Sequence, residues 1–345
     1  MTRTCASPAT ARPPWTSPPA VAPPSTRSSP ATWCSAATCA PCSTTELPSR
    51  CWATCSRRSR PRRRSPDVPE LPEVQAHAER LTEEFAGAVL QRFQPIAFTA
   101  LKTFSPDPAV THGEALESVG RRGKLLLLRF PSATHVVHLM QGGRLRPDPK
   151  QAAKPKGGQA RWTFDDGRAL LLSEAGTERK AGVWVVDGDP GDHEPLDHLG
   201  PDATEVDVDA MLALLHEENT RVHGFLRDQR RLAGLGRRLA NEVLHRAKLS
   251  PFAMTAKLGP DDAAALVAAI AGAVDEGLAY ERSREDMSSS KDRPGAVHHR
   301  TGEACPVCGD AIREVAYTRY TVHYCPTCQT GGKVLADNTT SKFLK

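Results

Sequence analysis

Four cysteines near the end of the chain constrain its fold more than any other feature of the sequence. They form two pairs, Cys305-Pro-Val-Cys308 and Cys325-Pro-Thr-Cys328, and sixteen residues separate the pairs. Four thiolates at this spacing can surround one tetrahedral Zn²⁺, whereas two disulfides would need an oxidising compartment. The residues between the pairs are rich in Val, Tyr and Thr, which favour strands. We therefore predict that Cys305, Cys308, Cys325 and Cys328 bind one structural zinc ion in a zinc-ribbon β-hairpin over residues 298–331, followed by a tail over residues 332–345.

A change in composition near residue 67 sets the other boundary of the folded chain. Residues 1–67 contain ten arginines, no lysine and only two acidic residues, and they show no hydrophobic periodicity. Such a segment cannot bury enough apolar surface to offset chain entropy, so we predict that residues 1–67 are a disordered or spurious extension. Six of the ten cysteines lie in it, which leaves a metal or disulfide role open, and its Arg-rich composition permits a transit peptide. We favour translation upstream of a non-AUG start codon at Val68.

The stretch from Val68 to Val74, Val-Pro-Glu-Leu-Pro-Glu-Val, predicts the start of a helix. Pro72 suits the first turn of a helix, because the N–H that proline lacks is not needed there. Glu70 and Glu73 would lie at the positive end of the helix dipole. Apolar residues then recur at helical spacing as far as Phe85, so we expect an amphipathic helix.

A free amine at Pro69 would give this stretch a chemical role. If Pro69 were the N-terminal residue, its amine would titrate near ~8 and would be partly uncharged at neutral pH. Such an amine can attack an aldehyde-like carbon and form an iminium. Glu70, next to it, could then move protons as the intermediate forms and collapses. The alternative is a capped surface helix without chemistry.

Short apolar runs punctuated by Gly, Pro and Asp extend from about residue 96 to residue 186 and predict strands. We expect two antiparallel sheets packed as a β-sandwich, within an N-terminal catalytic domain over residues 68–190. Residues 191–208 carry many acids and no Lys or Arg, so we predict an acidic linker there. Helical runs at 210–215, 225–232, 238–247 and 263–278 then predict a helical domain over residues 209–297, which ends in a polar loop. The fold class is therefore α+β with several domains.

Positive charge is local in this chain. The whole sequence has a net charge of +5, but without residues 1–67 it has 35 basic and 38 acidic residues. Between Arg221 and Lys248, however, eight basic residues face two acids. This segment also contains Gly234-Leu235-Gly236 between two predicted helices, where backbone amides could bind a phosphate. A simple helix–helix turn is the alternative.

These motifs together resemble the formamidopyrimidine-DNA glycosylase and endonuclease VIII family. The resemblance covers about residues 69–329 and includes, in the order of the family, Pro69-Glu70, Arg-Arg-Gly-Lys124, His138-Leu-Met-Gln-Gly-Gly, the glycine turn of a helix-two-turn-helix domain and the zinc ribbon. The resemblance implies that Pro69, Glu70 and Lys124 are catalytic. It implies DNA-binding roles for His138, Arg237 and Arg319.

The chain also departs from the family pattern at four places. Gln141 stands where the formamidopyrimidine branch has a methionine that fills the gap left by the flipped base. Ala181 stands where that branch has an intercalating phenylalanine. Arg237 replaces an asparagine that holds a phosphate, and Arg319 lies one residue away from the position of the hairpin arginine. The first two departures argue against strict recognition of 8-oxoguanine opposite cytosine.

By this resemblance we predict a base-excision-repair DNA glycosylase with AP lyase activity that removes oxidised bases from duplex DNA through a Schiff base on Pro69. Its partner would be damaged double-stranded DNA, and the protein would be a cytoplasmic, nucleoid-associated monomer. No apolar run approaches the 18 or so residues that cross a bilayer, so we expect no membrane association. The alternative is a noncatalytic DNA-binding zinc-ribbon protein of the same fold.

Overall fold

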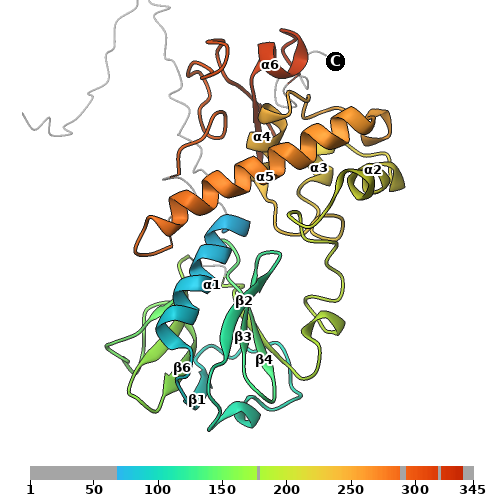
Figure 1. Cartoon of the computed structure of the whole chain (residues 1–345). Helices are drawn as coiled ribbons and strands as arrows, with labels where there is room; N and C mark the ends of the chain where they lie inside the picture. Colours follow the sequence, from blue (N-terminus) through green and yellow to red (C-terminus); the bar gives the residue numbers. More distant parts are fainter. Residues whose placement is uncertain (1–67, 177–178, 288–292, 318–319, 337–345) are drawn as a thin grey trace, which may run out of the picture. The chain divides into compact units, whose positions relative to one another are not determined.

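The computed structural model describes residues 68–176, 179–287, 293–317 and 320–336 (Figure 1). The chain divides into two compact units, Met1–Pro61 and Arg62–Lys345, and all the described residues belong to the second unit. The predicted extension over residues 1–67, with its six cysteines, lies outside the described residues, as does Arg319.

Helix α1 (Leu71–Phe85) begins and ends where the sequence predicts. Pro72 lies in its first turn, and the Glu73 carboxylate accepts a hydrogen bond from the backbone N–H of the N-cap residue Glu70. The apolar stripe of the helix, which includes Val74, Leu81 and Phe85, is buried. The helix packs against one sheet and against the long helix α5 (Pro260–Arg282), so it touches both main parts of the unit.

The β-sandwich predicted from the short apolar runs is confirmed. One antiparallel sheet has the order β1-β6-β7-β5 and consists of Leu90–Pro95, Gly158–Phe164, Ala169–Glu174 and Gly143–Pro147. The other has the order β2-β3-β4-β8 and consists of Ser118–Arg122, Leu125–Arg129, Thr134–His138 and Gly182–Val186. Inward-facing side chains such as Trp162, Leu126 and Val137 form a common core with the apolar side of α1. A short 3₁₀ helix, η1 (Pro108–Thr111), precedes β2.

A second core joins the helices that follow the sandwich. These are α2 (Val208–Glu217), α3 (Val222–Phe225), α4 (Arg237–Arg246) and α5, with 3₁₀ turns η2 (Pro190–Asp192) and η3 (Thr255–Lys257). The helix predicted over residues 225–232 is wrong, because α3 ends at Phe225 and a turn follows. The backbone N–H groups of Arg231 and Leu232 donate to the carbonyl oxygen of Asp228 in short turns, and the Gln229 side chain binds the backbone of Gly234 and Leu235 beyond them.

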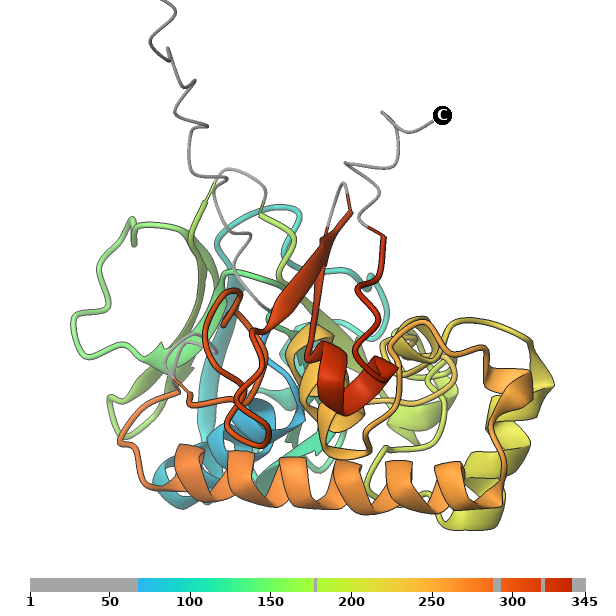
Figure 2. The ribbon, with the colours of Figure 1, turned by 90° about the horizontal axis from the view of Figure 1, so that it is seen from above.

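Helix α5 is the one described helix that is long and apolar enough to span a membrane, with a mean hydropathy of 1.4. Figure 2 shows it running lengthwise past α1 and α4, and it contacts α1, α2 and α4. The core helix of a water-soluble protein passes the same test. The expectation of no membrane association was based on the length of uninterrupted apolar runs. That criterion does not detect α5, because acidic residues flank the apolar centre of the helix.

The ribbon predicted at the C-terminal end is present. Strands β9 (Arg313–Ala316) and β10 (Thr321–Tyr324) pair as an antiparallel hairpin, and the short helix α6 (Pro326–Thr330) follows. Cys305 and Cys325 are buried in a small core with Val297 and Ile312. Strand β10 and helix α6 both contact α4.

Candidate active site and metal centre

Glu70 links the start of α1 to the start of α4. Its Oε1 and Oε2 atoms accept hydrogen bonds from the backbone N–H groups of Arg238 and Leu239, both at 2.9 Å. These groups belong to the first turn of α4, so the carboxylate caps the positive end of that helix. Gly236 permits this approach, because a Cβ atom there would overlap the Glu70 carboxylate. Glu70 is only 2% exposed, and Pro69 beside it is also buried.

Glu73 lies one turn further along α1 and has a different environment. The Nη1 atom of Arg293 lies 3.2 Å from its Oε1 atom, and both side chains are buried. Burial raises the pKa of Glu73 to about 7, and the positive charge of Arg293 opposes that rise. Glu73 is therefore about half protonated at neutral pH.

Lys124 faces the same place from the sandwich. It lies in the tight turn between β2 and β3, where Gly123 has a positive φ of 56°. Burial lowers the pKa of Lys124, while the charge of Glu70 raises it and those of Arg227 and Arg237 lower it. Pro69-Glu70, Lys124 and Arg237, predicted from separate stretches, therefore lie within electrostatic reach of one another.

His138 also lies near Lys124, because it pairs with Leu125 across the β3–β4 ladder. Burial, and then the charge of Lys124, lower the pKa of His138 to about 4. In the protein without DNA the ring is therefore uncharged at neutral pH.

Arg237 is the first residue of α4 and is half-buried. Its N-cap is Gly236, so it lies at the helix N-terminus that the glycine turn predicts. Gln141 is exposed on the turn before β5, and Ala181 is 1% exposed within the sandwich core, so no wedge projects from it.

The candidate metal centre contains the four predicted cysteines, and His245, which the sequence does not predict, lies beside Cys305. Sγ of Cys308 lies 3.3 Å from that of Cys325, and Sγ of Cys305 lies 3.9 Å from that of Cys328. A tetrahedral zinc ion with Zn–S bonds of ~2.3 Å separates its sulfur ligands by about 3.8 Å, so these thiols fit such an ion. Nε2 of His245 lies 3.3 Å from Sγ of Cys305. The donor atoms of His245, Cys305, Cys325 and Cys328 lie within 4.8 Å of one another, so this group could hold a metal ion.

Helix α4 also carries the hydrogen bonds that fix the ribbon. The Asn241 side-chain amide makes two contacts with the segments that form the ribbon. Its Oδ1 atom accepts a hydrogen bond from the backbone N–H of His323 at 3.3 Å, and its Nδ2 atom lies 2.8 Å from Nδ1 of the His298 ring. Gln329, directly after the last cysteine, donates to the carbonyl oxygen of Leu249 at 2.9 Å. Glu70 therefore caps one end of α4, and the other end of the helix contacts the candidate metal centre through His245.

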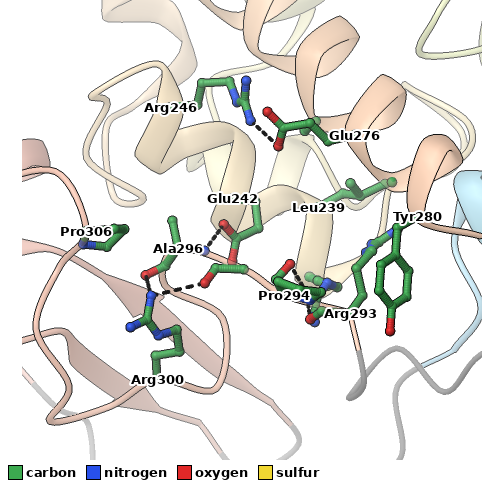
Figure 3. A pocket seen from close by; sticks show the side chains of 14 residues that line it. Leu239, Glu242, Arg246, Glu276, Tyr280, Arg293, Pro294, Ala296, Arg300 and Pro306 are labelled. Carbon is green, nitrogen blue, oxygen red and sulfur yellow. Dashed lines mark hydrogen bonds and ion pairs between the residues drawn. The ribbon is translucent and has the colours of Figure 1, made fainter.

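A cavity of about 400 Å³ lies between α4, α5 and residues 293–300 (Figure 3). Its polar side chains are engaged with one another and with the backbone. Arg246 pairs with Glu276 at 2.6 Å, and the Glu242 carboxylate accepts from the backbone N–H of Ala296 at 2.7 Å. Glu242 therefore anchors the segment that enters the ribbon.

Two family models match the sandwich and the helical domain of this chain. The profile of the formamidopyrimidine-DNA glycosylase N-terminal domain matches residues 68–183, and that of the formamidopyrimidine-DNA glycosylase H2TH domain matches residues 199–289. The formamidopyrimidine-DNA glycosylase of Symbiobacterium thermophilum is 31% identical over an alignment of 281 residues that covers 76% of this chain and 89% of that protein. The chain belongs to the formamidopyrimidine-DNA glycosylase family.

Other relatives of this glycosylase family share part or all of the fold. An uncharacterised formamidopyrimidine-DNA glycosylase-like protein of Mycobacterium tuberculosis is 42% identical over 149 residues, which are 43% of this chain and 94% of that protein. The crystal structure of the MutM (Fpg) protein from Thermus thermophilus superposes with a TM-score of 0.66 at 27% identity and covers 77% of this chain and 100% of that one. Lactococcus lactis Fpg, bound noncovalently to DNA with an AP site, gives a TM-score of 0.67 at 22% identity, with coverage of 76% and 100%.

Several residues of this family member escaped prediction from the sequence. His245 stands sixty residues before Cys305, and a single histidine in an amphipathic helix carries no metal-binding signal. Asp202 lies in the acidic linker but is buried, where it pairs with Arg121 at 2.5 Å and accepts from the N–H of Gly123 at 3.4 Å. It thus steadies the turn that carries Lys124.

Proposed function

We propose that this protein is a base-excision-repair DNA glycosylase with AP lyase activity that removes oxidised bases from duplex DNA. The observation that carries the proposal is the junction at Glu70. There the residue next to Pro69 is held by two N–H groups of α4, and Lys124 faces it from the sandwich. The names of the relatives, formamidopyrimidine-DNA glycosylases, support the same reaction class.

The proposed chemistry begins at Pro69. Its nitrogen attacks C1′ of the damaged nucleotide, the bond from C1′ to the base breaks, and the base leaves with a proton. Ring opening then gives an iminium between Pro69 and C1′. Loss of a C2′ proton expels the 3′ phosphate by β-elimination, and a δ-elimination follows. Hydrolysis of the remaining imine frees the amine. An enzyme of this kind acts on a nucleotide flipped out of the duplex.

We assign proton transfer to Glu70 and charge stabilisation to Lys124. Both Glu70 oxygens accept a backbone hydrogen bond, and each keeps a further lone pair for a proton from the sugar. Lys124 would place its ammonium beside the phosphate of the flipped nucleotide. His138 and Arg237 would contact neighbouring phosphates. We retain Arg319 as a DNA contact on the resemblance alone.

The mechanism requires a free amine. In the 345-residue chain the Pro69 nitrogen belongs to a tertiary amide, whose lone pair is delocalised into the carbonyl. We propose that the active protein begins at Pro69, after initiation at codon 68 and removal of the initiator residue. It would act on double-stranded DNA as a monomer associated with the nucleoid.

Borohydride trapping tests this mechanism. The protein that begins at Pro69 should become covalently linked to abasic-site DNA when borohydride reduces the iminium, and the full-length chain should not. Glu70→Gln should still bind DNA and should lose base excision. Trapping by a full-length chain whose mass shows that residues 1–68 are intact would overturn the mechanism and would point to Lys124 as the nucleophile.

We also propose a single structural zinc ion bound by Cys305, Cys308, Cys325 and Cys328. The four thiolates suit zinc, and His245 would donate its Nε2–H to the Cys305 thiolate. When bound, the ion supplies folding energy to the ribbon and takes no part in the reaction.

We propose a looser choice of lesion than strict 8-oxoguanine opposite cytosine. Gln141 and Ala181 replace the two wedge residues of the family, and the burial of Ala181 leaves no side chain to intercalate at that position. Oxidised pyrimidines and bare abasic sites should therefore be cut at least as well. In a competitive cleavage assay, a preference for 8-oxoguanine opposite cytosine of about tenfold over both, or ~1.4 kcal/mol, would contradict this proposal.

A noncatalytic DNA-binding protein is the second candidate, favoured by the amide at Pro69 in the chain as written. The two differ in the N-terminus of the protein isolated from its own cells. A native mass that begins at Pro69 supports the enzyme, and one that retains residues before Val68 supports the binding protein.

A further inference from the structure

We propose that Arg227 binds a backbone phosphate of DNA beside the reacting nucleotide. This inference rests on the proposed function and adds a DNA-binding residue to it. Arg227 lies in the turn after α3, outside the glycine turn, and its side chain reaches the tip of the β9–β10 hairpin at Tyr320. No sequence motif marks it.

An aromatic stack holds the Arg227 side chain in place. Its Cζ atom lies 4.1 Å from the centre of the Tyr320 ring, a distance at which a cation and an aromatic face attract. The Tyr320 ring in turn stacks on Tyr317, with centroids 4.6 Å apart and planes at 17°, and on His223, with centroids 6.1 Å apart. The guanidinium therefore rests on a ring that is itself immobilised between α3 and the ribbon.

The guanidinium nevertheless lacks a full set of partners. Its Nη1 atom is buried and has no hydrogen-bond partner among the described residues. Arg221, the N-cap residue of α3, differs because it donates to the Tyr317 hydroxyl at 2.9 Å. A buried donor without an acceptor is costly, and the cost is higher for a charged group. The cost is removed if an acceptor binds there.

The surroundings select an anion as that acceptor. Burial lowers the pKa of Arg227, and the positive charge of Arg237 lowers it further, while Tyr320 and Glu70 raise it. Lys124 faces the same group of charges. Glu70 and Glu73 are the acids that act on Lys124. Both Glu70 oxygens already bind the N-terminus of α4, and Glu73 is paired with Arg293. The three cations Lys124, Arg227 and Arg237 thus face carboxylates that are already hydrogen-bonded or ion-paired, which leaves net positive charge where the first turn of α1 meets α4.

A phosphodiester fits this requirement best. A guanidinium presents paired N–H groups that match two phosphate oxygens, and its stacking on a ring fixes the plane in which they point. Because Arg227, Arg237 and Lys124 come from three elements, they would grip consecutive or opposed phosphates rather than one small ion. DNA held by all three would lie with its sugar near Pro69.

Binding of a duplex with a tetrahydrofuran abasic analogue tests the inference. The full chain suffices, since binding needs no free amine at Pro69. Arg227→Met should weaken binding by about tenfold or more at ~100 mM salt, and the slope of log K against log salt should fall by about 0.9, as for one lost phosphate contact. Arg227→Lys should keep the slope and lose part of the affinity. Arg246→Met, which removes the same charge from α4 beside Glu276, should match the wild type.

Two further variants separate the charge from the stack. Tyr320→Phe keeps the ring and should bind like the wild type, whereas Tyr320→Leu should weaken binding, since Arg227 loses its support. Equal affinity and equal slope for Arg227→Met and wild type would overturn the role of Arg227. The role would also be overturned if inorganic phosphate alone stabilised the wild type against thermal unfolding and did not stabilise Arg227→Met. That result would show a site for a small ion rather than for DNA. Failure of the wild type to bind the damaged duplex would instead refute the proposed function.

Discussion

Gly236 is the residue that lets the two halves of the proposed active site meet. Its backbone is extended, with φ −125°, so any residue could adopt the conformation. The requirement is for space, because the Glu70 carboxylate occupies the position of a Cβ atom. Sequence rules that assign glycine to positions of positive φ cannot predict a glycine that is required only because a neighbouring side chain needs the space.

Replacing Gly236 with alanine should therefore displace Glu70. We expect Gly236→Ala to lower the free energy of unfolding by about 1–3 kcal/mol, the usual cost of overpacking, and to abolish base excision while the ribbon keeps its metal. Gly224→Ala is the matched control, since nothing lies within 4 Å of a Cβ atom there. Urea denaturation of both variants, with an excision assay, measures the difference. Similar behaviour of the two would show that the contact of Gly236 with Glu70 does not matter.

Glu73 should make stability depend on pH. Its pKa is 4.5 in the unfolded chain and about 7 in the folded protein, raised by burial against the charge of Arg293. The folded state therefore binds the proton more tightly, and the stabilisation is complete below pH 4.5 and is lost as the pH rises through 7. At about 1.36 kcal/mol per pKa unit, the loss is about 3 kcal/mol. As the pH rises from 4.5 through 7, we expect the unfolding free energy of the wild type to fall relative to that of Glu73→Gln. Above about pH 8 the difference between the two proteins should no longer change.

Arg293, Glu70 and Glu281 are the charges that act on Glu73, and all three remain in the variant. Urea midpoints of both proteins at several pH values from about 5 to about 8 give the comparison. Because His77 and the other buried histidines titrate in both proteins, their contributions cancel in the difference. Parallel profiles for the two proteins would show that Glu73 is ionised throughout this range.

At the scale of elements, helix α4 connects the proposed chemistry to the metal centre. Its first turn binds Glu70, and its last turn brings His245 to Cys305. The hairpin and α6 pack on the same helix, so loss of the ribbon would remove one side of α4. This arrangement explains why a structural metal far from Pro69 should influence DNA binding.

Zinc analysis of two single variants distinguishes the fourth ligand. We expect Cys308→Ser to lose stoichiometric zinc and to bind DNA about tenfold or more weakly, with the sandwich still folded. His245→Ala should retain one zinc ion and release it to a chelator faster, because only a hydrogen bond to Cys305 is lost. The opposite pattern, zinc kept by the serine variant and lost by the alanine variant, would make His245 the fourth ligand.

At the scale of the whole folded unit, Asp202 fastens the linker to the sandwich. Arg121 binds it through two nitrogens, at 2.5 and 3.2 Å, and the Thr204 hydroxyl donates to it at 2.8 Å. Burial disfavours the charge, but these hydrogen bonds and the charge of Arg121 hold the pKa of Asp202 below its usual value. The acidic residue at this position of the linker therefore has a structural role, because it pairs with Arg121.

Asp202→Asn should destabilise the unit strongly. Removing one partner of a buried pair leaves Arg121 unpaired, which typically costs about 3–5 kcal/mol. The stability of the wild type should also fall in acid, since a depressed pKa gives stabilisation that is lost as the pH drops through it. Glu205→Gln, an exposed neighbour, should leave the unfolding free energy unchanged. Thermal or urea unfolding of the two variants measures the difference. Equal unfolding midpoints for Asp202→Asn and Glu205→Gln would contradict the role of Asp202.

The sequence by itself determined those features that short-range patterns encode. Short apolar runs separated by Gly, Pro and Asp predicted the sandwich, and apolar residues at helical spacing predicted α1. The cysteine spacing and the strand-favouring residues between the pairs predicted the hairpin, and the structure confirms each of these elements. The motif at Pro69 and the turn at Lys124 could be recognised because each is contiguous. The prediction of a helix over residues 225–232 was wrong, because this segment forms short hydrogen-bonded turns after Phe225.

Only the tertiary structure decided which single polar residues matter. His245 meets Cys305, Asp202 meets Arg121, Arg293 meets Glu73 and Arg227 meets Tyr320, and each pair is 60 or more residues apart in the chain. A lone polar side chain has no periodicity, and its meaning depends on a partner that folding alone brings near. The hydrophobic pattern chooses the fold because many residues contribute to it, whereas burial, charge and partner at one residue are set by the packing of distant elements.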